Sequence, residues 1–162
     1  MGLAMAKLSY LTVPDLLNIN LRATKTSKDF HFARLEEAVF YQYGHGSSSD
    51  AVKQAGNFIT GFVKMMPFTE GNEATAFVGM LAFLTMNGHD LHISDDEAAD
   101  WVRSVWADPE NVGPKMEVKL NSHEVHHHHG VPDTRGIITE IFEKYPKTIS
   151  ELVSTGHKAV LA

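Results

Sequence analysis

The chain of 162 residues contains no cysteine, so disulfide bonds and thiol chemistry are excluded. That absence is compatible with a cytoplasmic protein, which is the location we expect. Basic residues are few, with 14 Lys and Arg against 20 Asp and Glu. The formal net charge of −6 and the lack of a basic stripe argue against nucleic acid as a sequence-independent partner.

Long hydrophobic runs are equally scarce. Residues 74–86 carry no charge and are apolar on almost every face of a helix. This segment is shorter than the roughly 20 apolar residues that cross a bilayer, and it lacks flanking basic anchors. Residues 1–10 likewise lack the basic and long apolar regions of a secretory signal. A helix that is apolar all round is normally buried, so we predict the central helix of a soluble core and no membrane partner.

Capping signals and apolar spacing predict further helices around this one. Thr12, Pro14 and Asp15 suit the start of a helix that runs to about Arg22. The other expected helices cover residues 31–43, a segment capped by Asp50, a segment that starts at the capping box 94–97, residues 134–144, and a last segment that starts at a second capping box, 148–151.

One segment favours a strand. Residues 115–120 alternate with period two, and residues 121–122 are expected to turn them into a short β-hairpin with 123–125. With at most this hairpin, the predicted fold class is all-α (mainly α), a compact bundle around the buried central helix. We predict a helical core in residues 1–107 and a C-terminal extension, residues 108–162, packed on the same domain.

The central helix follows directly on the turn 66–72. Gly71 and Asn72 leave backbone N–H groups unpaired at the positive end of a helix, which is a ready site for an anion. Such a terminus in a soluble domain predicts phosphate or nucleotide binding.

Residues 66–76 resemble the signature of the Fic/Doc superfamily. The family pattern reads His-Pro-Phe, a variable residue, Asp or Glu, Gly or Ala, Asn, Lys or Gly, Arg, and Thr-Ala or a relative. The residues that agree with it are Pro67, Phe68, Glu70, Gly71, Asn72, Thr75 and Ala76. Segments 10–12, 35–38 and 84–88 also resemble the family, so the resemblance covers about residues 8–105.

The resemblance implies a compact all-α bundle that transfers AMP, another nucleotidyl group or phosphate to a protein hydroxyl. It implies ATP or another nucleotide as donor, with Gly71, Asn72 and Phe68 at the phosphates and Mg²⁺ on Glu70. Doc members are toxins neutralised by an antitoxin, so the implied partner is a protein, either an antitoxin or a target. Assembly into a homo-oligomer stays open.

The chain departs from the family pattern at its chemistry. Met66 stands at the His position and cannot act as a general base, whose loss costs about 10²–10⁴ in rate. Glu73 and Ala74 stand at the Lys and Arg positions. A carboxylate about 4 Å from a phosphate is repelled by on the order of 4 kcal/mol at an effective dielectric of about 20. The helix terminus contributes only about 0.3–1 kcal/mol, so no catalytic residue is assigned.

Two interpretations of Glu73 remain. Because it follows Glu70 by three residues at a helix start, the two carboxylates could hold Mg²⁺ together. Alternatively, Glu73 is an acid favoured in the first turn of a helix. His45 is an alternative general base, although surface or capping roles are expected for it and for His31.

The second distinctive feature is a histidine-rich turn, residues 123–129, with His at five of its positions. Imidazoles at this density bind zinc, nickel or copper where three converge. Alternation in an extended segment places His123, His127 and His129 on one face, so these are the candidate ligands for Zn or Ni. The alternative is a solvated loop with weak and unselective metal affinity.

Three functions therefore compete. The favoured one is a Fic/Doc-like protein with a degenerate motif, catalytically impaired, that acts as a binding or regulatory module related to toxin–antitoxin systems. The second is an active AMP- or phosphotransferase with unorthodox residues. The third is a metal-binding protein that acts through the histidine-rich turn.

Overall fold

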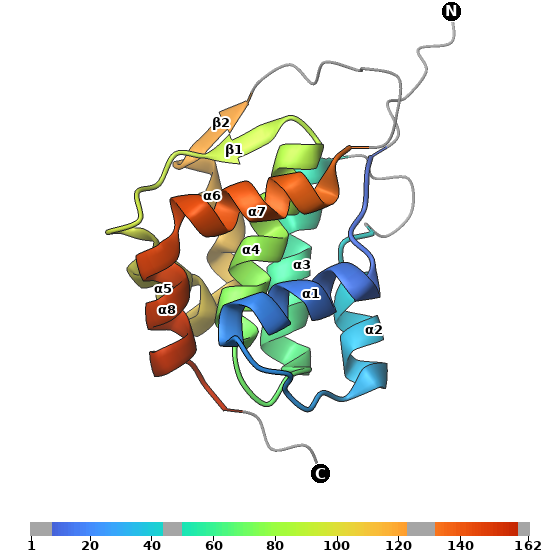
Figure 1. The fold of residues 1–162 in the computed structure, drawn as a ribbon. Helices are drawn as coiled ribbons and strands as arrows, with labels where there is room; N and C mark the ends of the chain where they lie inside the picture. Colours follow the sequence, from blue (N-terminus) through green and yellow to red (C-terminus); the bar gives the residue numbers. More distant parts are fainter. Residues whose placement is uncertain (1–7, 44–49, 123–131, 159–162) are drawn as a thin grey trace, which may run out of the picture.

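The computed structural model describes residues 8–43, 50–122 and 132–158. It is mainly helical, as predicted (Figure 1). The elements are α1 (Val13–Thr24), α2 (Phe32–Phe40), α3 (Ala51–Met65), α4 (Asn72–Met86), β1 (His89–Leu91), α5 (Ala98–Ala107), the short 3₁₀ helix η1 (Pro109–Asn111), α6 (Val112–Glu117), β2 (Leu120–Ser122), α7 (Thr134–Lys144) and α8 (Pro146–Thr155).

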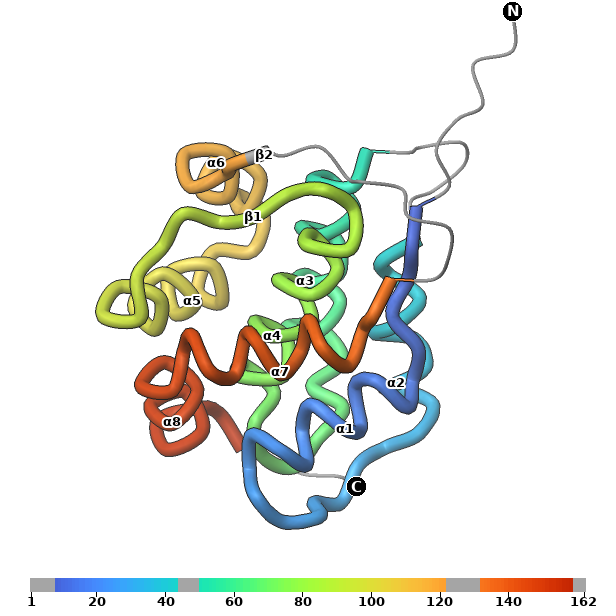
Figure 2. Tube along the Cα trace, turned by 45° about the horizontal axis from the view of Figure 1, so that its top comes forward, coloured from blue at the N-terminus to red at the C-terminus, as the bar shows by residue number. Residues whose placement is uncertain are grey.

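Helix α4 is the centre of the fold. All of its residues except Thr85 are buried, which confirms the prediction made from its apolar faces. Helices α1, α3, α7 and α8 pack around it (Figures 1 and 2). From the C-terminal part of the chain, the Tyr145 ring meets Phe77 of α4 edge-on at 5.2 Å between centroids. In residues 8–43, 50–122 and 132–158, no helix is both long and apolar enough to cross a membrane.

Local capping signals placed several helix starts correctly. Thr12 and Asp15 form the predicted capping box of α1. The Asp50 carboxylate accepts the N–H groups of Val52 and Lys53 at the start of α3. His31 caps α2 by accepting the Arg34 N–H on Nδ1, which is a capping role as expected.

The strand predicted at 115–120 is wrong. Residues 112–117 form α6, because Val112 and Met116 lie one helical turn apart and both face the core. Val118, which alternation placed on the same face as Met116, is 79% exposed. Only 120–122 are extended, and they pair antiparallel with β1, with Leu91 opposite Leu120. The hairpin partner predicted at 123–125 lies outside the described residues.

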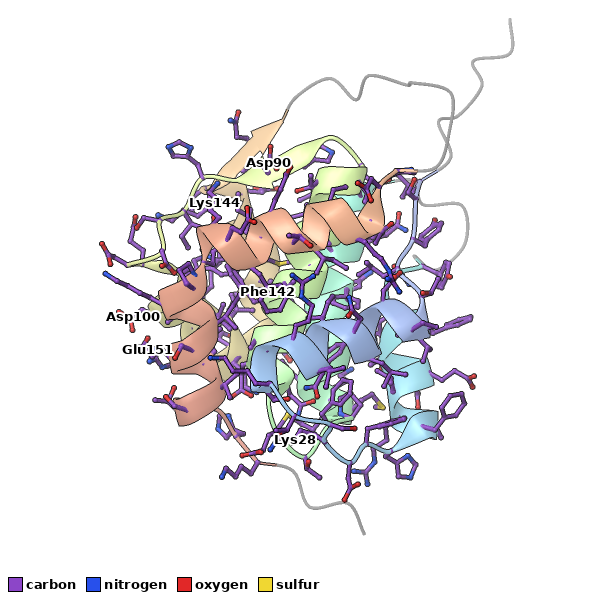
Figure 3. The ribbon with its side chains drawn as sticks, viewed as in Figure 1. Lys28, Asp90, Asp100, Phe142, Lys144 and Glu151 are labelled. Atoms are coloured by element: carbon purple, nitrogen blue, oxygen red, sulfur yellow. The ribbon has the colours of Figure 1, made fainter. Side chains whose placement is uncertain are left out.

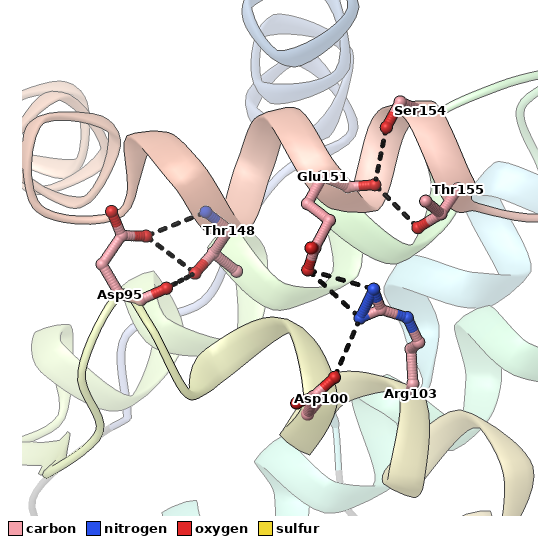
Figure 4. Close-up of polar contacts among 7 residues, drawn as sticks. All are labelled: Asp95, Asp100, Arg103, Thr148, Glu151, Ser154 and Thr155. Carbon is pink, nitrogen blue, oxygen red and sulfur yellow. Dashed lines mark hydrogen bonds and ion pairs between the residues drawn. The ribbon is translucent and has the colours of Figure 1, made fainter.

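The start predicted for the last helix is also wrong. Helix α8 begins at Pro146, and Thr148 lies inside its first turn. Its cap comes from Asp95, whose carboxylate accepts the Lys147 N–H at 3.1 Å. The same carboxylate accepts the Thr148 N–H and hydroxyl at 2.8 Å each (Figure 4). Asp95 belongs to the capping box, residues 94–97, that was predicted to start α5, and α5 begins later, at Ala98.

Burial raises the pKa of the Asp95 carboxyl, but the hydrogen bonds from Thr148 and then from the Lys147 N–H outweigh it. The pKa therefore lies below its ordinary value. A carboxyl with a lowered folded-state pKa stabilises the fold above its unfolded pKa, near 4, and loses that contribution as the pH falls through the folded value. Asp95 thus couples α8 to the segment before α5 in a pH-dependent way.

We expect Asp95→Ala to lower the free energy of unfolding by about 0.5–2 kcal/mol at pH 7, because α8 loses its cap. The difference from wild type should shrink as the pH falls below about 4, where the unfolded-state carboxyl of Asp95 becomes protonated, and it should be lost once the pH has passed the lower folded-state pKa. Urea unfolding at several pH values measures both effects. Asp96→Ala is the control, since Asp96 is exposed and its carboxylate pairs with the Lys147 ammonium at 3.2 Å instead of capping α8. Equal losses in the two variants would contradict the capping role.

Packing around α4 predicts a second contrast. Leu84 is fully buried in α4, whereas Leu21 of α1 is 47% exposed. Leu84→Ala should cost about 2–5 kcal/mol of unfolding free energy, because it removes buried methyl groups and leaves a cavity. Leu21→Ala makes the same chemical change and should cost less than about 1 kcal/mol. Urea midpoints compare them, and equal midpoints would show that α4 is not the core.

Candidate functional site

The turn that resembles the family signature joins α3 to α4. Met66 ends α3 in a left-handed conformation, with φ of 41° and its N–H bound to the Phe62 carbonyl. The Asn72 side chain closes the turn: Oδ1 accepts the Phe68 N–H at 3.0 Å, and Nδ2 donates to the Phe68 carbonyl at 2.7 Å. Asn72 is fully buried, so its amide serves the turn and is not offered to a ligand.

Helix α1 fixes the other side of the turn. Asn20 donates from Nδ2 to the Glu70 carbonyl at 2.9 Å and to the Thr75 hydroxyl at 3.1 Å. Gly71 has φ of 79°, and a Cβ there would lie 2.7 Å from Thr24 Cγ2 and 3.0 Å from Asn20 Nδ2. Both the positive φ and the close approach of α1 require glycine at this position.

Phe68 anchors the turn in the core. Its backbone bridges Phe30, with the His31 N–H on the Pro67 carbonyl at 2.9 Å and the Thr69 N–H on the Asp29 carbonyl at 3.1 Å. The Phe30 and Phe68 rings lie 6.0 Å apart, and Phe68 is buried. The ring is thus packed away from a ligand at the helix terminus.

Glu70 is bound by two ammonium groups. Lys28 Nζ lies 2.7 Å from Oε2 and Lys158 Nζ lies 3.1 Å from Oε1 (Lys28 is labelled in Figure 3). The hydrogen bond from Lys28, followed by that from Lys158, lowers the pKa of the Glu70 carboxyl. The residue that the resemblance assigns to Mg²⁺ is thus an anion already held by the chain's own cations.

Glu73 lies inside the protein. It is 3% exposed, and its Oε2 accepts the His157 N–H at 2.7 Å and lies 2.9 Å from His157 Nδ1. Its Oε1 is buried and has no hydrogen-bond partner among the described residues. Gly156 sits so close that a Cβ there would come within 3.0 Å of Glu73 Oε2. The C-terminal segment 156–158 therefore covers the start of α4.

This cover bears on the predicted anion and metal sites. Gly71, Asn72 and Ala74 are buried along with Glu73, and the Thr75 N–H is bound to the Gly71 carbonyl. Within the described parts of the chain, no group of three or more His, Asp or Glu side chains is arranged to hold a metal ion. Glu70 and Glu73 each have separate protein partners, so the structure gives their pairing on one cation no support.

A cavity of about 250 Å³ lies beside the covered carboxylate. Glu73, Trp106 and His157 line it, together with Arg103. The Arg103 guanidinium contacts Asp100 at 3.3 Å and Glu151 at 3.0 Å (Figure 4). This arginine is thereby neutralised by the protein's own acids and is a poor ligand for phosphate.

The structure does not describe the remaining predicted site residues. His123, His127 and His129, with the rest of the histidine-rich turn, fall outside the described residues, as does His45. Sequence reasoning missed the partners of the two motif carboxylates. His157 lies 84 positions from Glu73, and no local spacing signals a contact at that separation.

No protein-family model matches this chain, and neither the curated proteins nor the solved structures yield a match. The resemblance to the Fic/Doc superfamily therefore depends on the residues of the turn and its flanking segments alone.

The contact between Glu73 and the C-terminal segment can be tested by amide hydrogen exchange. In Glu73→Ala, the 156–158 amides should exchange about tenfold faster or more, because a hydrogen bond to a charged group typically contributes about 1.5–3 kcal/mol. Exchange in the middle of α4 should stay unchanged. Glu97→Gln removes a partly exposed carboxylate elsewhere and is the control. Unchanged exchange at 156–158 in Glu73→Ala would mean that other contacts hold the segment.

Proposed function

We propose that this chain is a Fic/Doc-like module that does not transfer nucleotidyl or phosphoryl groups and acts by binding a protein. The observation that carries the proposal is the occupation of both motif carboxylates by the chain itself. Glu70 is paired with Lys28 and Lys158, and Glu73 is buried beneath His157. A nucleotide and Mg²⁺ would have to displace these contacts before any chemistry.

The local electrostatics support the same proposal. Glu73 places a buried negative charge at the start of α4, where phosphate would have to bind. The nearby cations Lys28 and Lys158 are already used by Glu70. The positions that carry a base and an arginine in the family pattern hold Met66 and Ala74, neither of which ionises. These two positions therefore provide neither a base that accepts a proton nor a cation that neutralises phosphate.

A binding role is supported by the exposed face of α2. Phe32 and Phe40 are 58% and 69% exposed, and the Tyr43 ring lies tilted against the Phe40 ring, with 5.4 Å between the centroids. The carboxylates of Glu36 and Glu37 lie between them in sequence and are exposed. Exposed aromatic groups are typical of protein interfaces, and acids beside them favour a partner with a basic surface. A regulator or a toxin–antitoxin relative would act through such a face.

One observation favours a second candidate, a working transferase. The His157 ring lies against the Glu73 carboxylate while its side chain stays 70% exposed. A carboxylate that orients an imidazole is a common arrangement for a general base. His157 would then take the role that Met66 cannot fill. The described cations around this carboxylate, Lys28, Lys158 and Arg103, are already paired with acids, which is why we prefer the binding module.

Labelled nucleotides decide between the two. Purified protein is incubated with cell lysate and ATP labelled at the α- or γ-phosphate, with Glu70→Ala and His157→Ala as variants. We expect no labelled protein that depends on either residue. A labelled band lost in Glu70→Ala would overturn the proposal, and its additional loss in His157→Ala would identify the base.

The binding part is tested on the α2 face. Once a partner has been identified by cross-linking, Phe32→Ser with Phe40→Ser should weaken its affinity about 100-fold or more, because exposed aromatic residues dominate interface energies. Val118→Ser is the control, since Val118 is an apolar side chain that is even more exposed, at 79%, but lies on another part of the chain. Equal affinities of the two variants would place the interface elsewhere.

A further inference from the structure

A cleft of about 420 Å³ lies where the end of α1 meets α7 and α8. Its volume is within the range of small-molecule sites, roughly 300–1,000 Å³. Figure 3 labels Phe142, one of its walls, in the space between α7 and α1. Of the described residues that line it, Arg22 and Lys25 are ionisable, and none carries a carboxylate. That composition is unusual for a chain with a net charge of −6.

Arg22 is held in place before any ligand arrives. Its guanidinium stacks on the Phe142 ring at 4.7 Å from the centroid and donates to the Thr139 hydroxyl at 3.1 Å. Among the described residues it has no acidic partner. A planar guanidinium with fixed orientation and remaining N–H donors is suited to a carboxylate or phosphate.

Lys25 adds a second charge under backbone strain. It ends α1 with φ of 66°, a conformation that L side chains adopt only at a cost. It forms no ion pair with the described part of the chain. The Lys and Arg residues that do pair with acids there are Lys28, Arg103, Lys115, Lys119, Lys147 and Lys158. The cleft therefore holds two cations that lack an acidic partner among the described residues, and one of them, Lys25, has a strained backbone. Backbone strain is often found at ligand-binding sites.

The rest of the lining is mainly apolar. Pro146, Ile149 and Val153 of α8 and Phe142 of α7 form the wall, and the Ser150 hydroxyl is exposed beside them. A ligand that satisfies both parts must carry an acidic group and a hydrophobic body. Cations are disfavoured by Arg22 and Lys25. Nucleic acid would need a longer basic surface than these two residues provide.

We propose that this cleft binds a small amphiphilic anion, a carboxylate or phosphate monoester on an apolar body. The acidic group contacts Arg22 and Lys25, and the body packs on Phe142 and α8. The site does not depend on the function proposed above, because it uses neither Glu70 nor Glu73 nor the exposed face of α2.

The test is calorimetric titration of the whole chain with hexyl phosphate and with hexanoate. Lys25→Gly should weaken binding about tenfold or more, because a charged hydrogen-bond donor is lost. Its unfolding midpoint should stay equal or rise, since glycine adopts a positive φ without strain. Arg22→Gln should weaken binding to a similar extent. Lys64→Gln is the matched control, because Lys64 is also without an acidic partner among the described residues and does not line the cleft.

Each outcome decides one part of the proposal. Saturable binding of either probe that is weakened in Lys25→Gly and kept in Lys64→Gln supports the site. Equal affinity for hexan-1-ol would overturn the anionic requirement, and equal affinity for inorganic phosphate would overturn the apolar one. Absence of saturable binding, or binding that Lys25→Gly leaves unchanged, would overturn the cleft as the site.

Discussion

The burial of α4 is the constraint on which the rest of this structure depends. A helix without a polar face is stable in water only when neighbours cover every side of it. Each large side chain that α4 buries contributes roughly 1.5–3 kcal/mol, and the segments that cover it come from both ends of the chain. The C-terminal helices α7 and α8 are thus part of the same core as α1 and α3. Removing them would expose one side of the central helix.

The packing around α4 also explains how the turn before it keeps its shape without the histidine and the arginine of the family pattern. Asn72 is held by the Phe68 backbone, Gly71 by the close approach of α1, and Phe68 by its packing in the core. These residues are needed for the turn itself. Met66 and Ala74 contribute no polar side chain to these contacts, so the turn forms without a histidine or an arginine at those positions. A resemblance in the structural residues therefore carries little information about activity.

Sequence reasoning succeeded where the signal is local and failed where it is not. The box at Thr12, the cap at Asp50 and the apolar faces of α4 each lie within a few residues of what they determine. The cap of α8 comes from Asp95, 53 positions away, and no periodicity shows that contact. Residues 115–120 were predicted as a strand because apolar side chains, Val118 among them, alternate there with polar ones. Alternation shows which residues are apolar but not which are buried, and Val118 is exposed. The partners of Glu70 and Glu73 were missed because they too are distant in sequence.

Glu73 places a carboxylate at the start of α4, and the cost of burying it can be compared with the contacts that stabilise it. A buried acceptor without a partner costs about 1–3 kcal/mol, and Oε1 is such an atom among the described residues. The positive end of α4 offsets part of this cost, by about 0.3–1 kcal/mol and up to about 2 kcal/mol in a partly buried site. The hydrogen bond from the His157 N–H to Glu73 offsets a further part of it. Under the proposed binding function no phosphate binds at this helix end, so a cation at position 73 would face the positive end of α4 with no anion to balance it. Under that proposal, an acid at position 73 is the more stable choice.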